Sequence, residues 1–406
     1  MRRSTLATFA LAAAFAFNLG ATAKVNAGGY VTTDLVTDLP TLTDKNGIVH
    51  TGKVHDPNLV NPWGIAKSPT SPFWIADNNA GVSTLYNVPG GTPNSVTINP
   101  RVVSIPTPVD PLGRSGTSTG AVFNITILSG STPGFFISGV RADGTAISAP
   151  ATFLFATEDG TIVGWNPTVN PIGFDPAKAG NYGIIAIDNS GNNFTPDDNP
   201  KTGAVYKGLA IAKDANGNAH LYVTNFRSGT VEMYNDLFHA VSSPPDFADP
   251  GHLPNSYAPF NVAVIGGTIF VTYAVQDAAK HDDVAGQGHG IVNVFELDGT
   301  FRQRFAQHGQ LDSPWGMAFT PPDFGQLGGT LWIGNFGNGH INAYNVDSGE
   351  FIDKVRDPEG KAILIDGLWT ITFGNGGNGG GVDTLYFTAG TNDETHGLFG
   401  SLNPRN

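Results

Sequence analysis

Two segments of the chain concentrate carboxylates and imidazoles in stretches longer than a connection between strands needs. Long loops of this kind are often functional, and carboxylate oxygens together with histidine nitrogens form the ligand set of a divalent cation. The first segment covers residues 276–290 and the second covers 390–397. Their candidate metal ligands are Asp277, His281, Asp282, Asp283, Asp393 and His396.

These ligand types predict a bound divalent cation: calcium, otherwise zinc or manganese. The spacing does not identify the site, because the sequence contains neither His-Glu-x-x-His nor the regular aspartate spacing of a calcium loop. In the alternative reading, Asp282, Asp283 and Asp393 accept backbone N–H bonds that hold long glycine-rich loops in shape. Both readings remain open from the sequence.

A second group of polar and aromatic residues recurs at fixed places in short β-type runs. The polar members follow the second run of a repeat, where they either cap a turn or line a ligand site. The tryptophans stand at the start of a first run, where they either fill space between sheets or form an aromatic floor for a ligand. The candidates for the ligand-binding face are Trp63, Asp77, Glu158, Asn225, Trp315, Asn335 and Trp369.

Catalytic residues cannot be assigned from motifs. The sequence has no Gly-x-Ser-x-Gly nucleophile elbow, and Ser115 does not fit one. The chain has no cysteine, which excludes thiol chemistry. A Ser-His-Asp triad stays possible, because triads assemble in space and not in sequence order.

The elements that must position these residues are repeated β-meanders. Residues 61–88 read as three short strands separated by Pro/Ser/Thr and Asn/Gly turns, and the same pattern returns at 313–346. Six such units open near residues 64, 120, 208, 260, 316 and 368. Units of three to four strands at this period predict an all-β, six-bladed β-propeller.

The sequence also predicts how the ring closes. The sixth unit runs out of chain after its third strand, whereas residues 30–39 form a strand without a unit. We therefore expect this N-terminal strand to complete the last blade. First-strand starts and second-strand ends of a meander share one end, which we call the upper face. Lys207 and Glu158 belong to this face, as do the other ligand-face candidates.

The first 27 residues predict a cleaved signal peptide. Arg2 and Arg3 precede an apolar run, and small residues follow it. The expected organisation is a signal peptide at 1–27 and one propeller domain at 28–406, without a transmembrane segment. A protein without disulfides that is secreted fits a periplasm or a bacterial exterior. Removal of the signal changes the formal charge from -13 to -16, and such acidity argues against nucleic-acid binding.

The repeats carry a resemblance. Pro-Trp-Gly-Ile/Met-Ala followed by Trp-Ile-Ala/Gly resembles NHL-type repeats of six-bladed propellers. Together with 280–286 and 387–400, the chain looks like a family of exported bacterial propeller proteins, with the match covering about 30–406. That resemblance implies a fold and an exported setting and no particular reaction. Related six-bladed enzymes include metal-dependent gluconolactonases and streptogramin-type lyases.

Two functional hypotheses follow. In the first, the protein is a secreted binding or scaffold protein of the envelope or exterior, whose upper face takes a small molecule, a glycan or a protein. In the second, it is a metal-dependent hydrolase or lyase acting at the channel mouth, where the cation would polarise a carbonyl or activate water.

Overall fold

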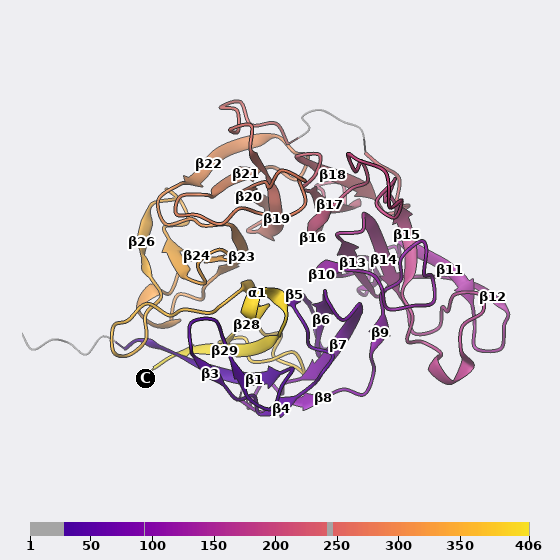
Figure 1. Cartoon of the computed structure of the whole chain (residues 1–406), viewed down its shortest axis with the longest axis horizontal. Coiled ribbons are helices and arrows are strands. Elements are labelled where there is room, and N and C mark those ends of the chain that lie inside the picture. The colour runs from indigo at the N-terminus through magenta and orange to yellow at the C-terminus, as the bar shows by residue number, and fades with distance from the viewer. Residues whose placement is uncertain (1–27, 93, 242–246, 406) are drawn as a thin grey trace, which may run out of the picture.

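The computed structural model describes residues 28–92, 94–241 and 247–405, and these residues form a nearly all-β, six-bladed propeller (Figure 1). The predicted signal peptide, residues 1–27, lies outside the described residues. In the described part of the chain, no helix is both long enough and apolar enough to cross a membrane.

Each blade is built on an antiparallel meander that runs outward from the central axis; the outermost strand of the last blade is the exception and pairs parallel with its neighbour. The strands of the first three blades are β5 (Pro62–Ala66), β6 (Phe73–Asp77), β7 (Val82–Asn87), β8 (Thr97–Ile98) and β9 (Val103–Ser104); β10 (Ser118–Phe123), β13 (Phe153–Thr157), β14 (Thr161–Trp165) and β15 (Ile184–Asp188); and β16 (Tyr206–Lys213), β17 (Ala219–Asn225) and β18 (Thr230–Asn235).

The remaining blades follow the same order. Their strands are β19 (Tyr257–Ile265), β20 (Thr268–Val275), β21 (Ile291–Phe295) and β22 (Phe301–Gln307); β23 (Pro314–Phe319), β24 (Leu331–Asn335), β25 (Ile341–Tyr344) and β26 (Phe351–Lys354); and β27 (Leu368–Phe373), β28 (Leu385–Ala389), β29 (Leu398–Pro404), β1 (Tyr30–Thr37) and β4 (Val54–His55).

Shorter elements decorate these blades. One hairpin pairs β11 (Phe136–Val140) with β12 (Ala146–Pro150), and a second hairpin pairs β2 (Leu42–Thr43) with β3 (Val49–His50). Single helical turns are Ile125–Ile127, Pro176–Lys178, Gly325–Leu327 and α1 (Thr391–Glu394).

The ring closes as the sequence predicts. Strand β1 pairs antiparallel with β29, from Tyr30 opposite Pro404 to Thr37 opposite Leu398. The two ends of the described chain therefore meet in one sheet, which Figure 1 shows as an indigo strand beside a yellow one. This pairing covers the edge that the sixth unit would otherwise leave open.

The core is divided among the gaps between blades. In the described residues, six buried apolar clusters each join two neighbouring blades. For example, Trp74 and Leu85 of the first blade pack on Phe153 and Val163 of the second. A seventh cluster contains residues from several blades and lies where the inner strands meet. That central cluster supports the candidate site.

Candidate functional site

The inner strand of every blade breaks its regular pairing near its first residues. In β16, for instance, Tyr206 pairs with Asn225 and Leu209 pairs with Val223. Lys207 and Gly208 therefore both lie opposite Thr224 and form a bulge. A bulge changes the direction in which a side chain points. Each of the six inner strands has one bulged residue at the equivalent position. These residues are Trp63, Thr119, Lys207, Phe260, Trp315 and Trp369.

Glycine follows the bulged residue in four of the six inner strands, because neighbouring inner strands touch there. A Cβ added at Gly64 would lie 2.4 Å from the carbonyl oxygen of Thr119. At Gly208 it would lie 2.3 Å from Oδ1 of Asn261. Neither distance leaves room for a Cβ atom. The inner strands, and with them the bulged residues, therefore pack closely around the axis.

Three of the bulged residues are tryptophans, and they form an aromatic cluster on the axis. Trp63 and Trp369 stack with ring centroids 3.4 Å apart, and Phe336 stacks on the other side of Trp369 at 3.9 Å. Trp315 packs edge-on against both indoles, at 6.0 and 5.8 Å. The three indoles are buried, so they pack on one another across the axis and form a closed base under the upper face.

Lys207 occupies the equivalent position in the third blade and is only 1% exposed. Its ammonium group lies 5.1 Å from the ring centroid of Trp63 and 5.8 Å from that of Phe226. The same group forms an ion pair with Oε1 of Glu158 and lies 3.5 Å from Oδ1 of Asp282. A lysine therefore stands where three other blades place an indole, and it is held by cation–π contacts and carboxylates.

Glu158 reaches Lys207 from the turn that follows β13. Its backbone N–H donates to the carbonyl of Thr117, which ties the turn to the start of β10. The second carboxylate oxygen accepts a hydrogen bond of 2.9 Å from Nδ2 of Asn78 in the first blade. Both oxygens of Glu158 are thus engaged, one by a cation and one by an amide.

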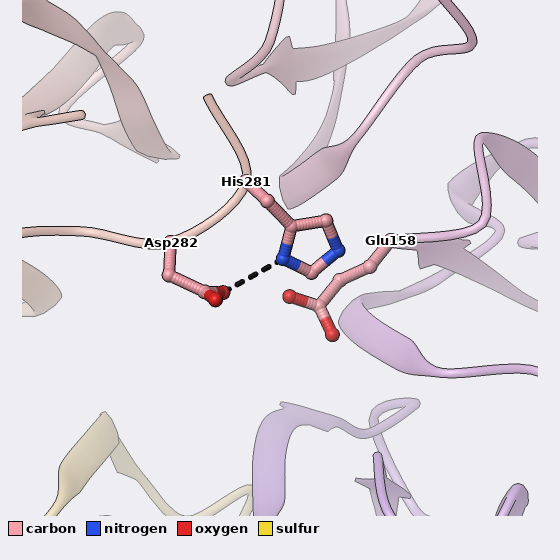
Figure 2. A group of neighbouring side chains, drawn as sticks. All are labelled: Glu158, His281 and Asp282. Carbon is pink, nitrogen blue, oxygen red and sulfur yellow. Dashed lines mark hydrogen bonds and ion pairs between the residues drawn. The ribbon is translucent and has the colours of Figure 1, made fainter. Parts of the chain in front are cut away.

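The long loop after β20 folds toward the axis and delivers His281 and Asp282. Oδ1 of Asp277 accepts the backbone N–H groups of His281 and Asp282, at 2.8 and 3.3 Å. Lys280 adopts a left-handed φ of 55° at the bend. His281 and Asp282 then face Glu158 across the centre, and a hydrogen bond of 2.8 Å joins Nδ1 of His281 to Oδ1 of Asp282 (Figure 2).

A further carboxylate, Glu394, enters from α1, which lies near the centre of the ring beside β5 (Figure 1). Its Oε2 accepts a hydrogen bond of 2.6 Å from Nδ2 of Asn61, and its backbone carbonyl accepts one of 2.7 Å from Asn79. Oδ1 of Asn61 in turn accepts the indole N–H of Trp369 at 3.0 Å. Glu394 is therefore connected to the aromatic cluster through Asn61.

The charged groups change one another's proton affinities. A hydrogen bond from His281 holds the pKa of Asp282 at about 2, and the same bond raises the pKa of His281. Burial lowers the pKa of Lys207, but the carboxylates of Glu158 and Asp282 outweigh that effect and raise it. Burial, reinforced by the charge of Glu158, raises the pKa of Glu394 to about 7. At neutral pH Lys207 is charged and Glu394 is close to its midpoint.

Three sequence-predicted residues at the ends of second strands are engaged outside this group. Asp77 is fully buried in the first blade, where Oδ2 accepts the backbone N–H of Thr84 at 2.9 Å. Asn225 donates to Glu232, and Asn335 donates to the carbonyl of Gln310. Asp283 follows Asp282 in the same loop; burial raises the pKa of its carboxyl, and the charge of Lys207 opposes that shift.

The second predicted loop, residues 390–397, does not bring its expected ligands Asp393 and His396 to the centre. Asp393 points to solvent and pairs with Lys45 at 3.3 Å. Nδ1 of His396 lies 2.7 Å from Oδ2 of Asp38. Glu394, between them in sequence, is the member of this loop that reaches the centre.

Sequence reasoning placed Lys207 on the upper face but did not single it out as a site residue. A signal was present, because Tyr206-Lys-Gly208 aligns with Pro-Trp-Gly at 62–64 and 314–316. A lysine in a position that otherwise holds an indole is a departure from the repeat. Asn61, Asn78 and Glu394 carried no comparable signal.

Several backbone positions of this face are strained. Asn61 and Ser313, two residues before Trp63 and Trp315, have φ values of 49° and 44°. Asn392, Asp393 and Glu394 are three successive left-handed residues, with φ of 53°, 52° and 67°. Non-glycine residues in this region cost free energy and cluster at functional sites.

One group of side chains offers candidate ligand atoms for a metal. In the described residues, Glu158, His281 and Asp282 each offer one ligand atom, and these atoms lie within 4.8 Å of one another. The ammonium of Lys207 bonds to one of these carboxylates and lies beside the other. A divalent cation at that point would compete with Lys207 for the same oxygens.

Comparison with known proteins places this chain among viral relatives and propeller structures. Proteins of Acanthamoeba polyphaga mimivirus are among its relatives: "Uncharacterized protein R648" is 28% identical over 354 residues, which cover 86% of this chain and 76% of that protein. "Uncharacterized protein L690" is 30% identical over 352 residues, covering 86% of this chain and 81% of that protein. No family model matches the chain.

A solved structure shares the fold at low sequence identity. The apo-form of the soluble aldose sugar dehydrogenase of Escherichia coli superimposes with a TM-score of 0.50 and 12% identity, covering 93% of this chain and all of that one. At that identity the likeness shows the propeller fold alone.

Proposed function

This chain belongs to one family with the mimivirus protein L690, and from that premise we propose that it binds a small polar molecule at the centre of its upper face. The observation that carries the proposal is Lys207, a buried lysine at a position that holds tryptophan in three other blades. The binding groups are His281 and Asp282, supported by Glu158 and Glu394.

A buried lysine at position 207 is not expected to increase the stability of the fold. Moving an ammonium and a carboxylate out of water costs several kcal/mol for each ion, and their attraction often only offsets that cost. Tryptophan, phenylalanine and threonine occupy the other five equivalent positions, so the ring does not need a cation there. A residue that departs from the local pattern without a gain in stability is expected at a functional site.

The groups above Lys207 are suited to hydrogen bonding with a polar ligand. The side chains of His281 and Asp282 are 39% and 66% exposed, so both remain accessible although they bond to each other. With Nδ1 of His281 donating to Asp282, Nε2 can hydrogen-bond to a ligand: it accepts from a hydroxyl in the neutral imidazole and donates in the imidazolium. Sugars, sugar acids and the polar end of a glycan or peptide present such hydroxyl or carbonyl groups.

We propose the location of the protein from its sequence pattern. The apolar run after Arg2 and Arg3 supports export of the protein, and the NHL-like repeats support a relationship with exported bacterial propellers. A binding protein of an envelope or exterior would display its upper face to diffusible ligands.

A thermal-shift screen tests the proposed binding site. Wild type, His281→Ala and His239→Ala are heated with monosaccharides, sugar acids, lactones and amino acids. We expect a compound that raises the melting temperature of wild type and of His239→Ala, an exposed histidine elsewhere, and not that of His281→Ala. If every stabilising compound acts equally on His281→Ala, the proposal is wrong.

A second candidate is a divalent cation at Glu158, His281 and Asp282, favoured by the convergence of their ligand atoms. Carboxylate and imidazole ligands suit manganese or zinc, and such an ion would support hydrolase or lyase chemistry. Because Lys207 competes for the same carboxylates, Lys207→Met should bind Mn²⁺ or Zn²⁺ more tightly than wild type in titration calorimetry. Equal affinity in both proteins would argue against a metal at this point.

A further inference from the structure

The β2–β3 hairpin lies outside the six blades and contacts the turn that carries Glu394. Nδ2 of Asn392 donates to the carbonyl of Thr43 at 2.9 Å. Lys45, in the turn between β2 and β3, lies 3.0 Å from Oδ1 of Asp366 and 3.3 Å from Oδ1 of Asp393. The hairpin therefore touches the last blade at the loop that enters the site.

Asp366 connects the hairpin to the strained turn. Its side chain is 1% exposed, and its Oδ2 accepts the backbone N–H of Asn392 at 2.9 Å. The same oxygen lies 3.5 Å from the backbone N–H of Lys45. A buried carboxylate between a lysine and a backbone amide is strongly constrained. If either partner is lost, the cost of burying its negative charge is no longer offset.

The turn needs such support. Asn392, Asp393 and Glu394 are all left-handed, and each non-glycine residue in that region costs roughly 1 kcal/mol or more. Strain of this kind persists only where surrounding contacts determine the conformation. Here the contacts are Asp366 and Thr43 on one side, and Asn61 and Asn79 on the other.

The base of the hairpin is fixed to the closing strand. Nδ1 of His50 in β3 lies 3.2 Å from Oδ2 of Asp34 in β1, and Nε2 lies 3.6 Å from Oδ2 of Asp44. Oδ1 of Asp44 accepts the backbone N–H groups of Asn46 and Ile48, which shapes the turn holding Lys45. The hairpin is thus anchored at one end to β1 and at the other end to Asp366.

We propose that the β2–β3 hairpin is a positioning element of the central site: Lys45, acting through Asp366 and Asn392, holds the left-handed turn that places Glu394 against Asn61. This inference rests on the proposed function only for the role of Glu394 in ligand binding. Lys45 itself touches no group at the centre and acts through the turn.

The charged groups around Glu394 come from three other blades and from the segments behind the turn. Glu158 follows β13, Lys207 lies in β16 and Asp282 lies in the loop after β20. Behind the turn stand Lys45, Asp366 and Asp393. If Lys45 is removed, the turn can relax outward, so that Glu394 leaves Asn61 and becomes hydrated. Its proton affinity should then fall toward that of an ordinary glutamate.

Infrared difference spectroscopy between pH 5 and pH 9 tests this without a ligand. Protonated Glu394 is assigned as the carboxyl band that is lost in Glu394→Gln. We expect its midpoint to fall by about one pH unit in Lys45→Met, and to stay at the wild-type value in Lys53→Met, an exposed lysine of the same segment. Lys45→Met/Asp366→Asn, which leaves no buried charge unpaired, should show the same fall.

The outcomes separate the two proposals. An unchanged midpoint in Lys45→Met and in the double variant would overturn the positioning role, whether or not a ligand binds. A lowered midpoint together with ligand binding that is unaffected by Glu394→Gln would keep the positioning role and contradict the part of Glu394 in the proposed function. If Lys45→Met does not fold, the double variant decides the question.

Discussion

At the scale of the residue, the site is a set of coupled charges above an aromatic base. Lys207 connects Glu158 from the second blade with Asp282 from the fourth. Asn61 and Asn78 of the first blade bind Glu394 and Glu158. Because each group touches a neighbour from another blade, a change in one is felt by the others. The site is therefore a property of the closed ring and of no single blade.

Glu394 gives a prediction for stability against pH. Its pKa in the folded protein is raised to about 7 from an ordinary value of 4.5. The stability gained from holding the proton is present below the ordinary pKa and is lost as the pH rises through about 7. Glu394→Gln keeps a neutral side chain, so it should unfold like wild type at pH 5 and be more stable by about 2 kcal/mol at pH 8.5.

Denaturant unfolding at both pH values measures this difference, with the exposed Glu359→Gln as the matched control. The control should differ from wild type by the same amount at pH 5 and at pH 8.5. A gap between Glu394→Gln and wild type that is equal at both pH values would contradict the burial of an ionisable Glu394.

The sequence identified part of this residue set. Glu158, His281, Asp282 and the three tryptophans were expected on the upper face, because a strand end and an unusually long loop are visible in sequence. The distinction between Glu394 and its neighbours Asp393 and His396 was not visible. It depends on three successive left-handed residues, and the contacts to them from Thr43, Asn61 and Asn79 come from more than 300 positions away.

At the scale of the element, the N-terminal segment does more than close the ring. Strand β1 was predicted to complete the last blade, since a strand without a unit and a unit without a strand are both apparent in sequence. The β2–β3 hairpin was not predicted, because two-residue strands leave no periodic pattern in a polar loop. Its structure depends on tertiary partners, namely Asp34, Asp366 and Asn392.

His50 gives the hairpin a dependence on pH. Burial opposes its charge, but Asp34 and Asp44 outweigh that effect and raise the pKa of His50. The stability from this ion pair is fully present below the ordinary histidine pKa and is lost as the pH rises through the raised value. His50→Gln should therefore be less stable than wild type at pH 5.5, with the difference shrinking by pH 9.

Thermal unfolding of the two proteins across that range measures the effect. His239→Ala serves as a control for the loss of an exposed histidine. A penalty for His50→Gln that grows with pH would have the wrong sign and would contradict the ion pair with Asp34 and Asp44.

At the scale of the whole molecule, six interfaces between blades and one aromatic cluster on the axis stabilise the fold. The interfaces are apolar throughout the described residues, as a repeated hydrophobic meander predicts. The axis could not be derived in the same way, because Trp63, Trp315 and Trp369 come together only when the ring closes. Lys207 and Glu158 are the departure from this apolar plan.

The central claim is that the Lys207–Glu158 pair serves binding and not folding. The most direct measurement is the free energy of unfolding of Lys207→Met/Glu158→Gln, compared with wild type and with Lys207→Met alone. We expect the single variant to lose about 3–5 kcal/mol, because Glu158 is left buried without its partner. The double variant should match wild type or exceed it by about 1–4 kcal/mol. A double variant less stable than wild type by several kcal/mol would show that the pair is needed for folding and would contradict the account.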